Sequence, residues 1–304
     1  MIIKVLGSAA GGGFPQWNCN CPNCRDVRLG SDGLRPRTQS SLVVSADGAN
    51  WVLLNASPDL RQQILATPEL APRQGELRSS PISAVVLTNG DVDHIAGLIC
   101  LREGHGFQLF GTDRVLSALA TNSVFAVLNP EQVRRTTLTL GRPFLVGGPG
   151  GLEIEAFAVP GKIALYLEDA AAGPGFGSLE GDTIGLSISD GRSRVLYIPG
   201  CARIDAALAT WLSGASTVFF DGTVYHDDEM IRLGLSQKTG ARMGHMSMAG
   251  PEGSLAAFAN FGIGRKIFVH MNNSNPALRE TSPEHAAVRA AGWEIAFDGM
   301  AVRL

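Results

Sequence analysis

The chain lacks long hydrophobic runs. No stretch of its 304 residues approaches the roughly 18 consecutive apolar residues that a membrane-spanning helix needs. The apolar run at the start, residues 1–6, is shorter than the core of a secretory signal peptide and is typical of the edge of a β-sheet. We therefore expect a soluble, cytoplasmic protein without a membrane span.

The sequence also lacks an excess of charge of one sign. Its 25 Lys and Arg residues nearly balance its 28 Asp and Glu residues, for a net charge of −3, and no basic stripe is present. This argues against nucleic acid as a partner. Hydrophobic residues make up 45% of the chain, which is enough for a sizeable core and excludes wholesale disorder. Without repeats or linkers, we predict one domain over residues 1–304; an oligomer stays open.

Cysteine is scarce, but three of the five cysteines crowd together as Cys19, Cys21 and Cys24. An odd, clustered set without a signal peptide argues against a disulfide framework. Three thiolates in so short a segment can surround one tetrahedral metal ion. A fourth ligand must come from elsewhere, and His270 and the segment 272–275 are candidates. Reduced free thiols and a reactive catalytic cysteine are the alternatives.

Segments rich in Val, Ile, Leu and Phe that end in Gly, Asp, Asn or Pro predict strands along the whole chain. They cover 2–6, 41–44, 51–54, 84–87, 152–157, 183–188, 195–198, 217–220, 266–269 and 294–297. Helical patterns cover 59–66, 95–103, 114–120, 205–212, 254–261 and 284–291. The early strands pair as hairpins, with Asp47-Gly48 as a turn. Later strands alternate with helices, so the order favours an α/β fold with two sheets covered by helices.

The segment Asp91-Val92-Asp93-His94 is the sharpest candidate site. It follows the apolar strand 84–87 and precedes an apolar helix expected from residue 95. Side chains at such a junction converge beyond the end of the strand, where carboxylates and an imidazole can hold a metal ion. The alternative is a helix start in which Asp91 or Asp93 caps the backbone and His94 has no chemical role.

Three further residues also follow apolar strands or precede a helix. His270 follows the strand 266–269, Asp221 ends the strand 217–220, and His245 precedes the helix expected at 254. Each could lie at the same rim of the sheet as Asp93. The alternatives are a hydrogen-bonded loop histidine for His270, a turn aspartate for Asp221 and a histidine near a helix cap for His245.

A glycine-rich loop, Gly11-Gly12-Gly13, follows the first strand. It lacks the Lys-Ser/Thr ending of a phosphate-binding P-loop, so we expect it to let the backbone approach the site. Gln16 and Arg37 are candidates for substrate binding, because an arginine suits a carboxylate through paired hydrogen bonds. An exposed salt bridge is the alternative for Arg37.

The segment from Leu87 to His94 resembles the His-x-His-x-Asp-His motif of the metallo-β-lactamase superfamily. Asp93 and His94 match its last two positions, whereas Asn89 and Asp91 stand where the motif has its two leading histidines. The superfamily's final histidine matches His270, and its middle histidine and bridging aspartate are missing near 159–161 and 200–201. The resemblance implies an αββα sandwich of two mixed sheets, with the second metal's ligands Asp93, His94 and His270 retained.

More specifically, the chain resembles the pyrroloquinoline quinone biosynthesis protein B family. The resemblance runs from Gly7 to Met300 and includes the segments 37–41, 55–59, 221–223 and 272–276. It implies a part in making a redox cofactor from cross-linked Glu and Tyr residues of a precursor peptide. The Cys-x-Cys-x-x-Cys segment is also similar to a structural zinc site of phosphodiesterase-like relatives, whose fourth ligand, a histidine, is replaced here by Asn273.

One carboxylate and two imidazoles with open positions form the ligand set of a non-haem Fe(II) oxygenase. We therefore expect Fe(II)-dependent hydroxylation of the tyrosine ring of a Glu–Tyr-derived precursor, with zinc or another divalent metal able to occupy the same site on purification. Asp91, Asp221 and His245 would orient ligands or move protons. The alternatives are a carrier for pyrroloquinoline quinone (PQQ) or its precursor and, more weakly, a metal-dependent hydrolase, since two-metal hydrolases use both ions.

Overall fold

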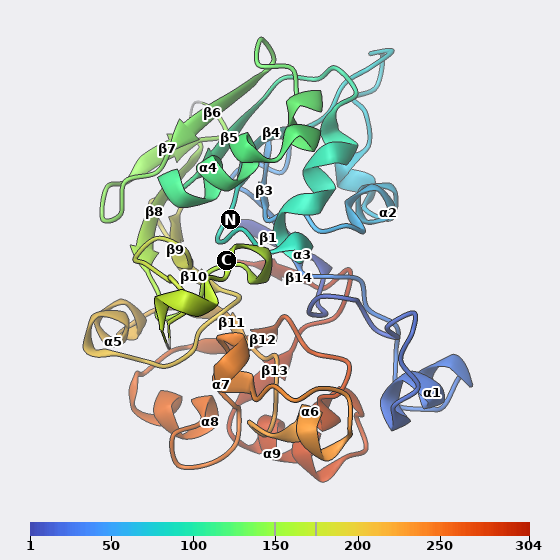
Figure 1. Cartoon of the computed structure of the whole chain (residues 1–304). Coiled ribbons are helices and arrows are strands. Elements are labelled where there is room, and N and C mark those ends of the chain that lie inside the picture. The colour runs from blue at the N-terminus through green and yellow to red at the C-terminus, as the bar shows by residue number, and fades with distance from the viewer. Residues whose placement is uncertain (149, 174) are drawn as a thin grey trace.

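The computed structural model, which describes residues 1–148, 150–173 and 175–304, contains two seven-stranded sheets that pack face to face (Figure 1). The first sheet has the order β14 (Ala301–Arg303), β1 (Ile2–Gly7), β2 (Ser41–Ser45), β3 (Trp51–Leu54), β4 (Ile82–Val86), β5 (Phe107–Gly111) and β6 (Val133–Thr137). The second has the order β13 (Trp293–Ile295), β12 (Arg265–Val269), β11 (Thr217–Asp221), β10 (Arg194–Ile198), β9 (Ile184–Ser189), β8 (Leu152–Ala158) and β7 (Phe144–Val146).

Both sheets are mixed. Strands β3 to β6 run parallel to one another, as do β10 to β13, and the remaining pairs are antiparallel. Parallel strands need crossover connections, which place helices on the outer faces. This explains why β2, β3 and β11 are buried along their whole length rather than on alternate residues.

The main core lies between the sheets. Consecutive residues of a strand point to opposite faces of its sheet. In β4, Val86 packs between the sheets with Leu186 and Phe219, whereas Val85 packs on the outer face with Leu60 and Leu119. The outer face of the second sheet has its own cluster, in which Phe220 and Trp293 pack with Phe258. The predicted αββα sandwich is therefore confirmed.

The helices form the two outer layers of this sandwich. Figure 1 shows α2, α3 and α4 on the side of the first sheet and α5, α7, α8 and α9 on the side of the second. The helix bounds are α1 (Pro22–Arg28), α2 (Leu60–Leu65), α3 (Val92–Ile95), α4 (Asp113–Thr121), α5 (Ala206–Leu212), α6 (Glu229–Arg232), α7 (Gly240–Met243), α8 (Ser254–Ala257) and α9 (Pro283–Ala290). Short 3-10 turns cover Pro68–Leu70, Ala96–Leu101, Ser123–Val127, Leu165–Leu167, Ala170–Ala172, Phe258–Asn260 and Pro276–Leu278.

The helix predicted over 95–103 differs from the observed one. The α-helix begins at Val92 and ends at Ile95, and a 3-10 helix continues it from Ala96 to Leu101. A Cβ atom on Gly97 would lie 2.0 Å from the carbonyl oxygen of Ser57, so this segment packs closely against the backbone after β3. Among the described residues, no helix combines the length and the apolar character that crossing a bilayer requires.

Candidate metal centre

The segment that follows β4 positions the first two side chains of the site. Asn89 to Asp91 lead from β4 into the short helix α3, where Asp93 and His94 lie. Asp91 is the N-cap residue by position, but its side chain accepts no cap hydrogen bond. The capping alternative therefore does not account for the Asp91 carboxylate, which is left free for the site.

Asp93, His94 and His270 come together although 176 residues separate His94 from His270 along the chain (270 − 94). One ligand atom from each of the three lies within 4.8 Å of the others. His270 Nε2 is 3.0 Å from Asp93 Oδ2, and the two imidazole rings meet edge to face with centroids 5.2 Å apart. The structure thus brings together the three ligands expected from the sequence, at the ends of β4 and β12.

His94 presents a lone pair to this site. Its Nδ1 lies 2.7 Å from Asn89 Oδ1, which can only accept, so Nδ1 carries the proton. Its Nε2 is buried and has no hydrogen-bond partner. Burial also lowers the pKa of His94 to about 4, so the ring is neutral at pH 7. A buried, unpartnered imidazole nitrogen is costly unless a metal ion or another group binds it.

His270 is held in a similar way by Thr223. Its Nδ1 lies 2.8 Å from Thr223 Oγ1, which leaves Nε2 directed at Asp93. The backbone of His270 has a φ of 58°, a left-handed conformation that non-glycine residues adopt rarely and mostly at functional sites. Both histidines therefore offer Nε2 to the same point, with Nδ1 fixed by a neighbouring oxygen.

Asp221 and His245 form a hydrogen-bonded pair beside His270 rather than joining the first three ligands. His245 Nδ1 is 2.7 Å from Asp221 Oδ2, and the rings of His245 and His270 stack with centroids 5.2 Å apart. Asp221 is fully buried and also accepts hydrogen bonds from the backbone N–H groups of Cys201 and Thr223. Asp221, His245 and His270 also meet the distance requirement for a second ligand group.

The carboxylates of the site have shifted pKa values. Burial and the neighbouring Asp93 raise the pKa of Asp91. Burial opposes ionisation of Asp93 and Asp221 as well, but the adjacent histidines lower the pKa of both below the ordinary value. Burial disfavours protonation of His270, yet its hydrogen bond with Asp93 raises its pKa. The cluster thus combines negative charge with imidazole nitrogens, which suits a divalent cation.

The two predicted substrate-binding residues lie in different environments. A Cβ atom on Gly11 would lie 3.5 Å from Asp93 Oδ2, so the glycine-rich loop borders the site, and one on Gly12 would lie 3.0 Å from Gln16, so Gln16 packs against this loop. Arg37 is buried, and its Nη1 donates to Ser8 Oγ and to the carbonyl oxygen of Ala296. The structure does not bring the Arg37 guanidinium into contact with the metal ligands.

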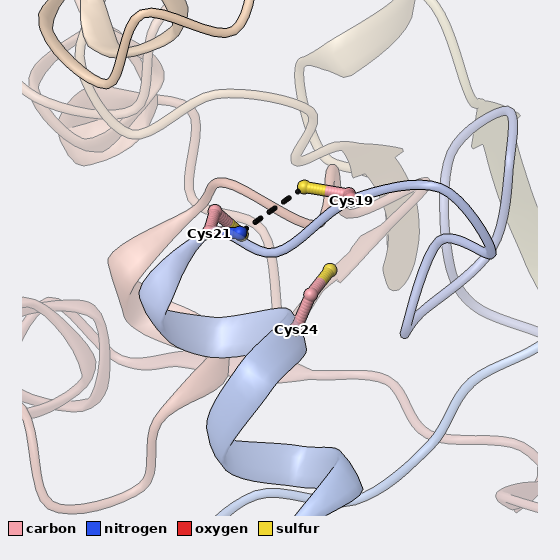
Figure 2. Close-up of side chains that lie close together, drawn as sticks. All are labelled: Cys19, Cys21 and Cys24. Carbon is pink, nitrogen blue, oxygen red and sulfur yellow. Dashed lines mark hydrogen bonds between the residues drawn. The ribbon is translucent and has the colours of Figure 1, made fainter.

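The three clustered cysteines form a separate candidate ligand group, which contains none of the histidines. Figure 2 shows Cys19 on the loop before α1, Cys21 where the helix starts and Cys24 in its first turn. All three are buried, with their sulfur atoms within 4.8 Å of one another. Burial, together with the neighbouring thiols, raises the pKa of Cys21 to about 12, and a bound cation reverses this penalty by stabilising thiolates.

Asn273 lies against these sulfur atoms. Its side-chain Nδ2 is 3.2 Å from Cys24 Sγ and 3.9 Å from Cys21 Sγ. The two ends of an asparagine amide are assigned from their surroundings, so turning the amide over places Oδ1 at the same position. Asn273 belongs to the segment 272–275 named as a source of the fourth ligand.

Asn89 and Thr223 contact the candidate site but were not predicted to take part in it. Each fixes the proton of one ligand histidine. Asn89 stands at the first histidine position of the superfamily motif, so its place in the motif was an available clue. Thr223 could have been noticed only as part of the segment Asp221-Gly222-Thr223 after a strand.

Comparisons with known proteins agree with this architecture. Residues 50–271 match the model of the beta-lactamase superfamily domain. A coenzyme PQQ synthesis protein B from Xanthomonas oryzae pv. oryzae is 55% identical over 304 residues, which covers 100% of both chains. The protein of the same name from Methylorubrum extorquens is 51% identical over the same length, again with 100% of both chains covered.

Solved structures give the same result. The crystal structure of Zn(2+)-bound PqqB from Methylobacterium extorquens has a TM-score of 0.96 with 51% identity, and the match covers 100% of both chains. A diphosphatase from the PhnP family has a TM-score of 0.69 with 21% identity, covering 99% of this chain and 96% of the other. The second similarity concerns the fold alone.

Proposed function

The chain belongs to the family of coenzyme PQQ synthesis protein B, and we propose that it acts in PQQ synthesis by hydroxylating the tyrosine ring of a Glu–Tyr-derived precursor. The reaction would use Fe(II) and O₂. One oxygen atom enters an aromatic C–H bond and the other leaves as water, with two electrons and two protons from an external two-electron reductant. The substrate in this proposal is a small organic precursor that is rich in carboxylates.

A single observation carries the proposal: Asp93, His94 and His270 supply one carboxylate and two Nε2 atoms to one point. This is the ligand set of non-haem iron oxygenases, which leaves coordination positions for O₂ and substrate. Bound Fe(II) would supply oxygen activation. A two-metal hydrolase site is less suitable, because Asn89 and Asp91 stand where the superfamily motif has histidines.

The chain's own residues have separate tasks in this proposal. Asn89 and Thr223 hold the ligand rings with Nε2 directed inward. Asp91, whose side chain caps no helix, and the hydrogen-bonded pair Asp221–His245 are positioned to accept or deliver protons at the site. Gln16 packs against Gly12 of the loop that borders Asp93, which supports a contact with the precursor in this proposal.

We further propose that Cys19, Cys21 and Cys24 hold a structural zinc ion with Asn273 as the fourth ligand. A PqqB that is 51% identical binds Zn(2+). The three sulfur atoms are buried and lie close together, and the Asn273 amide is 3.2 Å from Cys24 Sγ. A closed set of four protein ligands is typical of structural zinc.

The test is oxygen uptake by anaerobically purified protein loaded with Fe(II) and supplied with reductant. We expect O₂ consumption only with the Glu–Tyr-derived precursor present, and a hydroxylated product by mass spectrometry. Oxygen use without hydroxylated product contradicts the proposal. Saturable binding of precursor or PQQ without turnover would instead support a carrier, and zinc-dependent hydrolysis would support a hydrolase.

A histidine pair provides the matched variants. His270→Ala should abolish turnover and lower the iron content while the zinc content stays unchanged, which shows that the fold is retained. His226→Ala should behave like the unchanged protein, because the His226 ring makes no hydrogen bond with the described residues and belongs to none of the three candidate ligand groups. Undiminished hydroxylation by His270→Ala would remove His270 from the ligand set.

A further inference from the structure

We propose that a cavity of about 200 Å³ beside the edge strand β13 binds a small organic carboxylate. None of the metal-site residues lines it. Its charged and titratable lining residues are Arg35, Arg37, Glu280, His285, Arg289 and Glu294. They come from the loop before β2 and from the chain between Glu280 and β13, so the cavity lies where these two parts of the chain meet.

Arg37 is the main observation. Its exposed fraction is 6%, yet it forms no ion pair within the described residues. Nη1 donates to Ser8 and Ala296, whereas Nε is buried without any hydrogen-bond partner. A buried guanidinium is costly unless a carboxylate pairs with it and fills its donors. The fold therefore leaves donor capacity of Arg37 unused beside the cavity.

The nearest carboxylate to favour the Arg37 charge is Asp298, which is connected to it through the Ser8 hydroxyl and forms no direct ion pair with it. Arg35 pairs with Glu280 at 2.5 Å, and Glu294 pairs with Arg265 at 2.6 Å. The two acidic residues are thus already engaged, which leaves Arg37 and Arg289 as cations without an ion pair among the residues that the structure describes. The lining thus holds three arginines against two glutamates, which favours an anion.

His285 also lines the cavity. Its Nδ1 lies 2.9 Å from the carbonyl oxygen of Ala277, so that nitrogen carries a proton and is occupied. The groups that can donate to an anion in the cavity are therefore the guanidinium groups of Arg37 and Arg289.

The remaining lining residues favour an organic anion over an inorganic one. Ile295, Phe297 and Met300 contribute apolar side chains to the cavity. A carboxylate matches the planar fork of a guanidinium through two parallel hydrogen bonds, and a short hydrocarbon or aromatic body would contact the apolar side. The volume limits the ligand to a small molecule or to one end of a larger one.

The test is a calorimetric titration of the metal-loaded protein with benzoate at constant ionic strength, with chloride as the reference salt and inorganic phosphate as a second probe. We expect saturable binding of one benzoate in roughly the millimolar range, with weaker or no binding of phosphate. Absence of saturable benzoate binding overturns the proposal. Preferential binding of phosphate overturns the carboxylate assignment.

Variants locate the binding site. Arg289 lines the cavity from an exposed position of α9, so its replacement should leave the fold unchanged. Arg289→Ala should weaken benzoate binding about three- to tenfold. Arg61→Ala, at an exposed position of α2, is the matched control and should bind normally. Arg37→Lys keeps the charge but loses the fork, and should weaken binding at least as much as Arg289→Ala. Equal affinity in all four proteins would contradict the site. Turnover at the metal centre is a separate readout, so the two proposals can fail independently.

Discussion

The hydroxyl oxygen of Thr223 lies 2.8 Å from Nδ1 of His270. The same oxygen lies 2.6 Å from Asp221 Oδ1. An ionised carboxylate oxygen can only accept a hydrogen bond. Thr223 therefore donates to Asp221 and accepts from His270, so the Nδ1–H tautomer of His270 is fixed. This single hydroxyl connects the buried Asp221 carboxylate to the orientation of His270, a proposed metal ligand that lies 47 positions after Thr223 (270 − 223 = 47).

Replacing Thr223 with Val should lower metal affinity at the Asp93 site. Valine has a similar shape but leaves His270 Nδ1 and Asp221 Oδ1 without their shared partner, and the loss of such a partner lowers metal affinity about 10- to 100-fold. Competition with a chromophoric chelator measures the affinity. Thr223→Ser keeps the hydroxyl and serves as the control. Equal affinities for the Val and Ser variants would show that the hydroxyl does not hold the ring.

The two proposed metal sites should be separable by composition. Cys24→Ser should lose the zinc while keeping the iron, and it should unfold at a lower temperature, because the free energy of structural zinc binding contributes to folding. Elemental analysis and thermal unfolding give the two readouts. Asn273→Leu should weaken zinc binding, and Asn273→Asp, which keeps an oxygen ligand, should retain it. Full zinc retention in Asn273→Leu would exclude Asn273 as the fourth ligand.

The fold was largely predictable because most strands are uniformly apolar and end in turn-forming residues. Strand β4 and strand β12 were expected within about two residues of their observed bounds. Strand β6, with the sequence Val-Arg-Arg-Thr-Thr, was not expected, because an edge strand is only partly buried and carries polar residues. Helix α1 was missed for a different reason, since its residues were interpreted as a metal-binding segment and its apolar positions are few.

The site was predictable only in part. Polar residues that follow apolar strands marked Asp93, His94 and His270 as candidates, but β4 and β12 belong to different sheets, so their meeting depends on how the two sheets pack. The direction of the Arg37 side chain could not be predicted, because nothing in its sequence neighbourhood shows that Ser8 and Ala296 would engage its Nη1. The left-handed backbone of His270 was equally hidden, since it depends on contacts made across the fold.

The turn between β2 and β3 should respond to pH through Asp47. Burial opposes ionisation of this residue, but hydrogen bonds from Asn50 and Ala49 lower its pKa to about 2. A lowered pKa stabilises the fold at pH values above the ordinary value of 3.8, and this contribution disappears as the pH falls toward about 2.

Asp47→Ala should therefore be less stable than the unchanged protein at pH 6, and the difference should shrink at pH 3. Urea unfolding midpoints at the two pH values measure it. The control is Asp32→Ala, an exposed aspartate that accepts no hydrogen bond from the described residues. A difference that stays constant between pH 6 and pH 3 would mean that the Asp47 charge does not support the turn.

Asn55 should be one of the least replaceable residues next to the site. It has a φ of 60° and is fully buried. Its Nδ2 donates to Thr88 Oγ1, and its Oδ1 accepts from the backbone N–H of Thr88 at the start of the loop that carries Asp93 and His94. Asn55→Ala loses these bonds and puts alanine in a left-handed conformation that asparagine tolerates better, so the free energy of unfolding should fall by about 3 kcal/mol.

Asn55→Gly separates the two causes. Glycine also loses the hydrogen bonds but tolerates a positive φ, so this variant should be about 1 kcal/mol more stable than Asn55→Ala. Both variants should bind iron more weakly, because Thr88 and the loop that follows it lose their hydrogen bonds with the Asn55 side chain, which follows β3. Denaturant unfolding and iron titration measure the two effects. If the Ala and Gly variants were equally stable, the backbone conformation of Asn55 would not be the source of strain, and its hydrogen bonds alone would explain its importance.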